Sequence, residues 1–279
     1  MKNGILKSTL LFFLKKYQNI RSNLKIYVSY RSLINNVKNI KGYSSKKYNL
    51  EDKILILVPH ADDELISSHC FIENHRSQIT LFYCSLTGSN NDENNRIIRE
   101  NEFVEYCHSV GVDYCIADPK KDLFVQLKKI ISDYKPNVVC LTSCIDWHPE
   151  HCLLSYLLLD ILKVNDTIKY IDVYSVSFPM PPQFINSVYG MTKDSHARKW
   201  QLFGEIYKSQ KSLNTYRFKC WERLYAHCFK DFYAIEYHHV FSTEDWKSWI
   251  LGKIDSIVPH NIIGDMKAVF KLSTNIYTK

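Results

Sequence analysis

The sequence predicts an α/β fold with three layers, in which helices cover both faces of a mainly parallel, Rossmann-like sheet. From residue 53 onward, short apolar runs rich in β-branched and aromatic residues alternate with longer segments of helical spacing. That alternation is typical of a parallel sheet with helices on both faces. With 279 residues, of which 46% are hydrophobic and 23% charged, the chain can bury the core that such a fold needs.

The expected elements follow one another in a regular order. Strand-length apolar runs occupy residues 53–58, 79–84, 138–142 and 170–178. Segments with helical spacing lie between and after them, at residues 95–112, 121–136 and 148–164. Folds of this class bind their ligands beyond the carboxyl ends of the strands. We therefore expect the functional residues directly after the apolar runs.

Charge divides the chain into parts. The first fifty residues hold 11 Lys or Arg and no Asp or Glu, whereas the remainder holds 25 basic and 29 acidic residues. We expect residues 1–50 to form a basic extension, residues 51–245 the main domain, and residues 246–279 a C-terminal extension packed on that domain. An acidic domain is not expected to bind nucleic acid, because such binding requires clustered basic residues.

The N-terminal extension has two interpretations. Its apolar residues Ile5, Leu6, Leu10 and Phe13 have roughly helical spacing, and lysines surround them. Such a helix can lie on an anionic membrane, with each basic residue contributing about 1 kcal/mol, and residues 1–45 would then make a peripheral membrane contact. The alternative is an additional helix that packs on the domain. No run approaches the ~20 apolar residues of a membrane span, and nothing resembles a signal peptide.

The nine cysteines are scattered along the chain and include no Cys-x-x-Cys pair. An odd and unpatterned count in a chain of this length indicates reduced thiols rather than a disulfide framework. We therefore expect a cytoplasmic protein, peripheral at the inner face of the cytoplasmic membrane if the extension binds lipid.

Charged residues follow the first apolar run directly. The stretch ILILVPHADDEL, residues 54–65, places His60 and the acids Asp62, Asp63 and Glu64 where the next helix should begin. A helix N-terminus favours negative charge, so an acidic cap is one explanation for these residues. The other explanation is a bound cation, because buried carboxylates are costly unless something positive pairs with them.

A second cluster follows a later apolar run. In CIDWHPEHC, residues 144–152, His148 and His151 lie three residues apart, and Pro149 suits a first helical turn. The helix dipole opposes protonation of histidines there, and neutral imidazole is the form that binds metal. One histidine and one aspartate from the first loop, with one histidine from the second, would make the three-ligand set typical of catalytic zinc.

These motifs resemble those of the LmbE/PIG-L family of de-N-acetylases. The family has a His-Pro/Ala-Asp-Asp-Glu motif, here residues 60–64, and a later His-Pro-Asp-His motif, here residues 148–151. The likeness covers about residues 52–240 in the expected order. Ala61 stands where proline is more usual, and Glu150 stands where aspartate is more usual. Neither position is a ligand or a proton carrier in the implied scheme, so activity is expected to survive both changes.

The resemblance implies a metal site and a mechanism. It makes His60, Asp63 and His151 the ligands of one zinc ion per chain, although Fe²⁺ would accept the same ligands. It makes Asp62 the general base that takes a proton from the attacking water. His148 would polarise the amide oxygen or protonate the leaving amine.

Further features support the resemblance. A Thr-Gly loop of the family corresponds to Thr87-Gly88, and an Arg-x-x-Glu helix ending in Gly-Val corresponds to Arg99 and Glu102. A helix that ends in Ser-Gln corresponds to residues 207–210. The resemblance makes Arg99 a substrate-binding residue, and Glu64 would orient a ligand or close the start of its helix.

The predicted function is metal-dependent hydrolysis of the acetamido group of an N-acetylated amino sugar of the N-acetylglucosamine type, with release of acetate. The basic extension favours a lipid-linked sugar or a surface-glycan precursor as the substrate. One alternative is a deacetylase of a small soluble thiol–sugar conjugate. Another is a catalytically silent member that binds a glycan or a partner protein. A nucleotide-binding domain is disfavoured, because no Gly-x-Gly-x-x-Gly follows any apolar run.

Two further histidines remain as candidates for the same pocket. His238 and His239 are adjacent in an apolar, strand-like segment. Neighbouring residues of a strand point to opposite faces, so at most one of the two can face the pocket. Ordinary packing or a surface position is the alternative for each.

Overall fold

The computed structural model describes residues 2–42, 44, 48–86, 92–253, 255–262 and 264–278, with side chains from residue 16 onward. Its centre is a seven-stranded sheet with the strand order β3-β2-β1-β4-β5-β7-β6. The strands are β1 (Ile54–Val58), β2 (Ile79–Tyr83), β3 (Asp113–Ile116), β4 (Val138–Thr142), β5 (Tyr170–Tyr174), β6 (Ser187–Met191) and β7 (Ala234–Ser242). The first five strands are parallel, and β7 pairs antiparallel with both β5 and β6.

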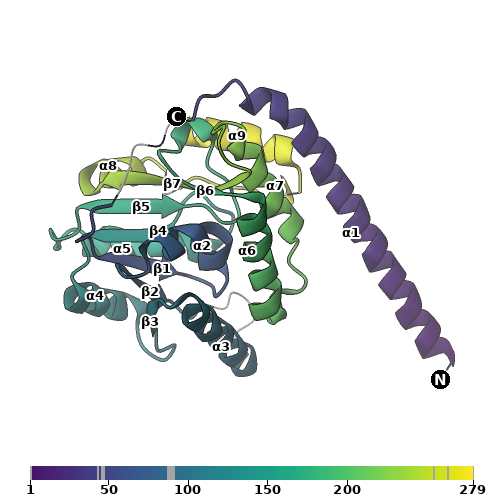
Figure 1. The fold of residues 1–279 in the computed structure, drawn as a ribbon. Helices are drawn as coiled ribbons and strands as arrows, with labels where there is room; N and C mark the ends of the chain where they lie inside the picture. Colours follow the sequence, from purple (N-terminus) through teal and green to yellow (C-terminus); the bar gives the residue numbers. More distant parts are fainter. Residues whose placement is uncertain are drawn as a thin grey trace.

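Helices surround this sheet, as Figure 1 shows. The α-helices are α1 (Lys2–Val37), α2 (Asp63–His75), α3 (Glu93–Val110), α4 (Leu123–Tyr134), α5 (Pro149–Ile161), α6 (Lys193–Ile206), α7 (Thr215–Ala226), α8 (Thr243–Leu251) and α9 (Met266–Thr278). Three short 3₁₀ turns are η1 (Pro182–Phe184), η2 (Lys208–Gln210) and η3 (His260–Ile262). The predicted fold class, a mainly parallel sheet flanked by helices, is confirmed.

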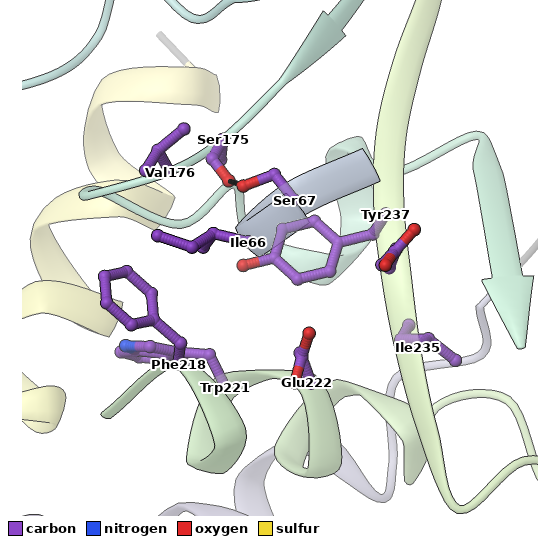
Figure 2. A pocket seen from close by; sticks show the side chains of 10 residues that line it. Ile66, Ser67, Ser175, Val176, Phe218, Trp221, Glu222, Ile235 and Tyr237 are labelled. Atoms are coloured by element: carbon purple, nitrogen blue, oxygen red, sulfur yellow. Dashed lines mark hydrogen bonds between the residues drawn. The ribbon is translucent and has the colours of Figure 1, made fainter. Parts of the chain in front are cut away.

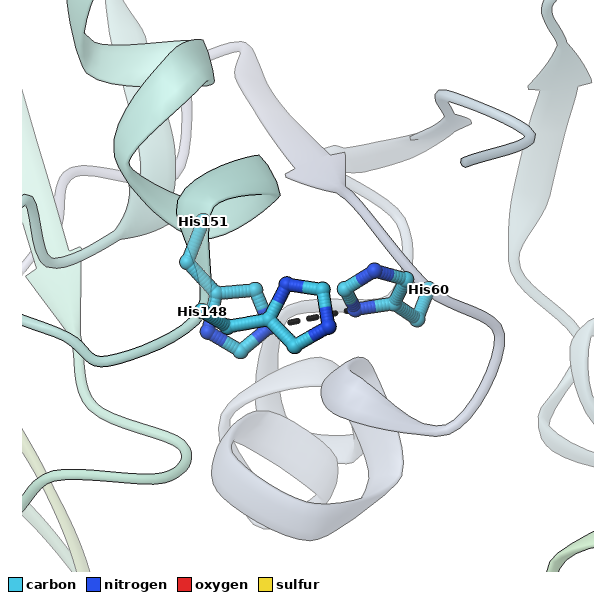
Figure 3. Close-up of side chains that lie close together, drawn as sticks. All are labelled: His60, His148 and His151. Carbon is cyan, nitrogen blue, oxygen red and sulfur yellow. Dashed lines mark hydrogen bonds between the residues drawn. The ribbon is translucent and has the colours of Figure 1, made fainter. Parts of the chain in front are cut away.

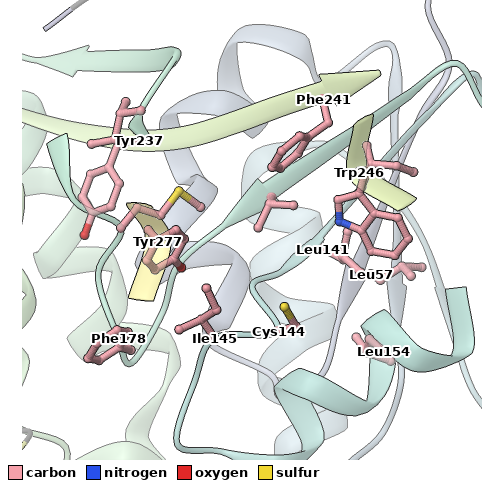
Figure 4. Packing of buried hydrophobic residues seen from close by; sticks show 14 of the residues in the cluster. Leu57, Leu141, Cys144, Ile145, Leu154, Phe178, Tyr237, Phe241, Trp246 and Tyr277 are labelled. Carbon is pink, nitrogen blue, oxygen red and sulfur yellow. The ribbon is translucent and has the colours of Figure 1, made fainter. Parts of the chain in front are cut away.

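The continuous apolar run of β1 is explained by burial on both faces. Ile54, Ile56 and Val58 point to one face of the sheet, where they join residues of α2, α3 and α6 in one cluster. Leu55 and Leu57 point to the other face and pack with residues of α4, α5, α8 and α9. Figure 4 shows part of this second cluster, with Trp246 of α8 beside Leu57 and Leu141. A strand covered on both faces has no polar side to present, so the sequence shows no alternation.

The sequence patterns did not predict two of the strands. β3 lies at one edge of the sheet, and its side chains alternate between exposed and half-buried. β6, at the other edge, contains a glycine and has only its two end residues buried. Edge strands are covered less completely than central ones, so their apolar signal is weak.

Helix α1 belongs in part to the core. Ile26, Tyr30, Leu33 and Val37 are buried in the larger cluster, and the helix contacts α7 and α9. Its N-terminal part extends away from the body of the molecule (Figure 1). The expected boundary after residue 245 falls within α8. The division into extensions and a catalytic domain stays a prediction.

Among the described residues, none of the helices combines the length and the apolarity that crossing a bilayer requires. All nine cysteines lie in the described part of the chain and are free thiols, as the sequence predicts.

A buried ion pair interrupts helix α2. Ser68 has non-helical backbone angles, φ −139° and ψ 15°. The ammonium of Lys199 donates to the carbonyl of Ile66 at 2.7 Å, and the carboxylate of Glu236 accepts from the N–H of Cys70 at 2.8 Å. In a regular helix these two backbone groups would bond each other. Here the Lys199–Glu236 pair, 2.7 Å apart, stands between them.

Lys199 also neutralises a second buried acid, Glu222, at 2.5 Å. Glu222 in turn accepts a hydrogen bond from Trp200 at 2.8 Å and lies 2.9 Å from a ring nitrogen of His196. One buried cation therefore serves two carboxylates and fixes α6, α7 and β7 against the break in α2.

We expect Lys199→Met to lower the free energy of unfolding by about 3–5 kcal/mol, because it leaves two buried carboxylates without a cation. Urea denaturation followed by circular dichroism measures this change. Lys129→Met is the matched control, since Lys129 is 75% exposed and pairs only with Asp133 on its own helix; its cost should stay below about 0.5 kcal/mol. Equal midpoints for the two variants would contradict the assignment.

Candidate metal centre and active-site cleft

The two predicted motifs meet at the carboxyl ends of β1 and β4, where the chain connections lead to opposite sides of the sheet. β1 and β4 are parallel neighbours, while the chain continues from β1 to β2 on one side and from β4 to β5 on the other. Crevices of α/β proteins form at the carboxyl ends of such a strand pair. The loop after β1 carries His60, and the loop after β4 carries His148. α2 and α5 then begin at Asp63 and Pro149, as the motifs predict.

Three donor atoms converge in this crevice. Nδ1 of His60 lies 3.1 Å from Nε2 of His151, and Oδ2 of Asp63 lies 3.2 Å from the first and 3.3 Å from the second. Figure 3 shows the two imidazoles joined by a dashed line, with His60 on the loop after β1 and His151 on the first turn of α5. A tetrahedral zinc ion with bonds of about 2.0–2.1 Å requires donors about 3.3 Å apart. The separations of the three donors therefore fit a small divalent ion.

The far side of each imidazole is held by an acid. Nε2 of His60 lies 2.6 Å from Oε2 of Glu150, and Nδ1 of His151 lies 3.0 Å from Oδ2 of Asp146. Metal-binding histidines almost always have such a partner, which fixes the ring and its tautomer. The sequence prediction missed both acids, although Asp146 and Glu150 stand within the second motif. Glu150 is the residue that departs from the usual aspartate.

The charges of the site favour a cation. Burial opposes the charged form of His151, but Asp146 and Asp63 outweigh it and raise the pKa of His151 to about 10. Burial opposes the charged form of Asp63 too, but His151 and His60 hold its pKa below the usual range. In the absence of a bound ion, two carboxylates therefore override the helix dipole at His151, where the sequence argument expected a neutral ring. Either a proton or a metal ion would neutralise the negative charge of these carboxylates.

His148 lies beside this group. Its ring is 4.4 Å from that of His60 and stacks on that of His151 at 5.0 Å (Figure 3). Burial, then His60 and His151, lower the pKa of His148 to about 4, so the ring is neutral. Its Nδ1 is buried without a hydrogen-bond partner among the described residues. Nitrogens of the three histidines lie within 4.8 Å of one another, so the donor set suits either a ligand or a proton carrier at His148.

Asp62 occupies a strained position at the start of α2. Its φ of 135° is rare for a residue with a side chain, and such strain clusters at functional sites. Its Oδ1 accepts from Nη2 of Arg99 at 3.2 Å. Burial raises the pKa of Asp62 to about 6, although Arg99 opposes the rise. This carboxyl group can therefore exchange a proton close to neutral pH.

Glu64 closes the start of α2 from inside. Its carboxylate accepts from the N–H of Asp62 at 3.1 Å and from the hydroxyl of Tyr207. Burial raises the pKa of Glu64 to about 8. Glu102 on α3 likewise accepts two bonds from Ser209, at 2.7 and 2.6 Å. The supporting motifs of the sequence thus contact one another or the first motif. Thr87-Gly88 lies outside the described residues.

A cleft of about 400 Å³ opens above these groups. All six predicted site residues line it, together with aromatic and polar residues of η2, α7 and the loops: His60, Asp62, Asp63, Arg99, His148, His151, Trp147, Ser177, Gln210, Leu213, Arg217 and Phe218 among them. Arg99 reaches the cleft, but its charge is paired with Asp62. The structure brings the predicted residues together, while their individual roles stay predictions.

His238 and His239 do not line this cleft. Nδ1 of His238 lies 3.0 Å from Asp172, and the hydroxyl of Tyr48 donates to the same carboxylate at 2.5 Å. His239 contacts Phe184 instead. His238, Asp172 and Cys140 lie close enough for a metal ion, but all three are fully buried, and His238 and Asp172 already contact each other within the core. Packing is therefore the observed role of both histidines.

Comparison with known proteins agrees with this fold. Residues 55–162 match the family model described as PIG-L: GlcNAc-PI de-N-acetylase. A comparison with curated proteins gave no match.

Several solved structures share the fold. The A40926 pseudoaglycone deacetylase Dbv21 has 15% identity and a TM-score of 0.53, over 68% of this chain and 97% of its own. The conserved protein TT1542 from Thermus thermophilus has 17% identity and a TM-score of 0.53, over 67% of this chain and 94% of its own. A triple mutant of a deacetylase from teicoplanin biosynthesis has 15% identity and a TM-score of 0.51, over 69% of this chain and 99% of its own. Residues 55–162, which carry both histidine motifs, therefore match the PIG-L family of de-N-acetylases, the family that the sequence motifs resemble.

Proposed function

We propose that this protein is a metal-dependent hydrolase that removes the acetyl group from an N-acetylated amino sugar. The observation that carries the proposal is the convergence of His60, Asp63 and His151, with donor atoms 3.1–3.3 Å apart, beside the buried carboxyl group of Asp62. The family description names a GlcNAc-PI de-N-acetylase, and several proteins of the same fold are deacetylases by their titles. These names support an amino-sugar amide as the substrate.

His60, Asp63 and His151 would hold the ion. Two imidazoles and one carboxylate form a ligand set that zinc accepts, and Fe²⁺ would accept it as well. When bound, such an ion polarises a carbonyl oxygen and lowers the pKa of a water molecule. The acids behind the two rings, Glu150 and Asp146, keep each imidazole oriented.

Two neighbours of the ligands would move protons. Asp62 takes a proton from the attacking water as the new C–O bond forms, and its raised pKa of about 6 suits this task near neutral pH. Arg99, bonded to Oδ1, holds the carboxylate in one orientation. The C–N bond then breaks, and the proton that Asp62 took from the water passes by way of His148 to the departing amine. The acetic acid that forms loses its own proton, so that acetate and a free amino sugar result. The neutral ring of His148 can accept the proton that it later gives away.

We also propose that α1 contacts an anionic membrane surface. Tyr17, Ile20, Leu24 and Tyr27 follow a spacing of three and four residues and are all exposed, Tyr17 by 63%. They lie away from the face that packs on the body through Ile26, Tyr30, Leu33 and Val37. The first fifty residues carry 11 basic and no acidic side chains, which complements anionic lipid and disfavours a second copy of the helix. A lipid-linked substrate would be presented at such a surface.

Metal content tests the ligand set. Wild-type protein should bind about one equivalent of Zn²⁺ per chain, and Asp63→Ala and His151→Ala should each weaken binding by at least about 100-fold, since each removes a direct ligand. Competition with a zinc-sensitive dye measures the affinity. His148→Ala is the matched control and should retain the metal if His148 carries protons only. Loss of zinc from that variant would move His148 into the ligand set.

Acetate release tests the reaction. The panel contains free N-acetylglucosamine, its lipid-linked conjugates and a soluble thiol conjugate, each with and without a chelator. We expect acetate from at least one sugar, its loss with the chelator, and a drop of about 100-fold or more in kcat for Asp62→Asn with zinc retained, because the base is removed. A near-normal rate in Asp62→Asn would show that the base is misassigned. No acetate from any compound would favour the silent, binding alternative.

Vesicle binding tests the membrane contact. Deleting residues 1–45 would strip buried side chains from the core, so the double variant Ile20→Asp/Leu24→Asp, at two exposed positions, is preferable. It should bind vesicles containing phosphatidylserine at least about tenfold more weakly, because two apolar anchors become charged. Val125→Asp is the control, since Val125 is 62% exposed on α4, away from α1. Equal sedimentation with vesicles for both variants would reject the contact.

A further inference from the structure

One cation in the cleft has no counter-ion among the residues that the structure describes. Arg217, near the start of α7, lines the same cleft as His60 and Asp63. Within the part of the chain that the structure describes, no carboxylate forms an ion pair with its guanidinium, and its side chain makes no hydrogen bond. Arg99, in the same cleft, is paired with Asp62. The cleft therefore holds one neutralised guanidinium and, among the described residues, one that is free.

The acid whose charge acts on Arg217 already makes contacts elsewhere. Asp146 acts on Arg217 through its charge. Its Oδ1 accepts from the N–H of His148 at 2.9 Å, and its Oδ2 accepts from the N–H of Ser177 at 3.3 Å and lies 3.0 Å from His151. Both oxygens are committed to the loops and to the candidate metal centre. Asp146 therefore acts on Arg217 through its charge but forms no ion pair with it.

The side chain of Arg217 is half-buried, and an aromatic ring holds its guanidinium in place. It lies over the ring of Phe218, 4.7 Å from the ring centre. Phe218 lines the cleft and also a small internal cavity of about 20 Å³, where Figure 2 shows Ile66 and Val176 across from it. Burial lowers the pKa of Arg217 to about 10, even though Asp146 opposes the change. A cation that has lost water and gained no partner attracts an anion.

We propose that Arg217 binds an anionic group, a phosphate or a carboxylate, on the sugar or the aglycone of the substrate. Its planar fork of N–H donors matches both groups, and an aromatic ring behind it fixes the orientation. The inference rests on the proposed deacetylase function and narrows its substrate to charged amino-sugar conjugates. It also explains why one arginine of the cleft is left unpaired while the other is neutralised.

Kinetics on matched substrates test the subsite. The probes are N-acetylglucosamine 1-phosphate, N-acetylmuramic acid and the neutral methyl N-acetylglucosaminide, which share the acetamido group and differ in charge. Arg217→Met should lower the ratio of kcat/KM between an anionic and the neutral substrate by about 10- to 100-fold, the effect of a lost charge-assisted bond. Arg217→Lys should recover part of the ratio. The phosphate and the carboxylate probe distinguish the two sources of charge.

Controls separate this inference from the proposed function. Lys208→Met removes an exposed cation on η2 that does not line the cleft, and it should leave the ratio unchanged. If Arg217→Met lowers all three rates equally, the anionic subsite is wrong while the deacetylase proposal stands. If no probe releases acetate, calorimetry with N-acetylglucosamine 1-phosphate decides the subsite alone. Binding at least about tenfold weaker in Arg217→Met supports it, and equal binding overturns it.

Discussion

The burial of the Asp63 carboxylate between two imidazoles is the constraint on which the rest of the site depends. Asp63 and His151 are almost fully buried, so water cannot satisfy the carboxylate. A charge in that position persists only if a cation meets it. The carboxylate of Asp146, on the other side of the His151 ring, adds a second negative charge to the site. The loops after β1 and β4 therefore form one site that attracts positive charge, and the separations of its donor atoms fit a small ion.

Contacts farther along α2 help to hold Asp63 in this position. α2 must begin at Asp63 and still pack against β7, and it does so by breaking its own ladder near Ser68. The Lys199–Glu236 pair satisfies the backbone groups that the break releases. The first turn of α2 is thus held independently of the rest of the helix. Because Glu64 also closes this turn from inside, the position of Asp63 is fixed from two directions.

The sequence was sufficient for the central strands and for both motifs, because burial on both faces of the sheet leaves an unbroken apolar run and the acids follow it directly. It was insufficient wherever a contact joins distant segments. Lys199 stands 37 residues from Glu236, and nothing local marks them as a pair. Glu150 looked like a neutral departure from the family pattern, yet it bonds His60 across 90 residues. His238 was a candidate for the pocket because its strand is late and apolar, but only the register of β7 against β5 directs it to Asp172.

The two arginines of the cleft differ in whether a carboxylate pairs with them. Arg99 and Asp62 form a pair that is almost fully buried, which keeps one carboxylate oriented while burial still brings its pKa close to neutrality. Arg217 has no such pair among the described residues. Asp146, the acid whose charge acts on it, is hydrogen-bonded to the backbone of a loop instead. A site with a surplus of acids around its candidate metal ligands would repel an anionic substrate. Under the proposed subsite, the guanidinium of Arg217 on the cleft wall would offset that repulsion locally, and the charged part of a conjugate would lie on α7 while its amide reaches Asp62 and His148.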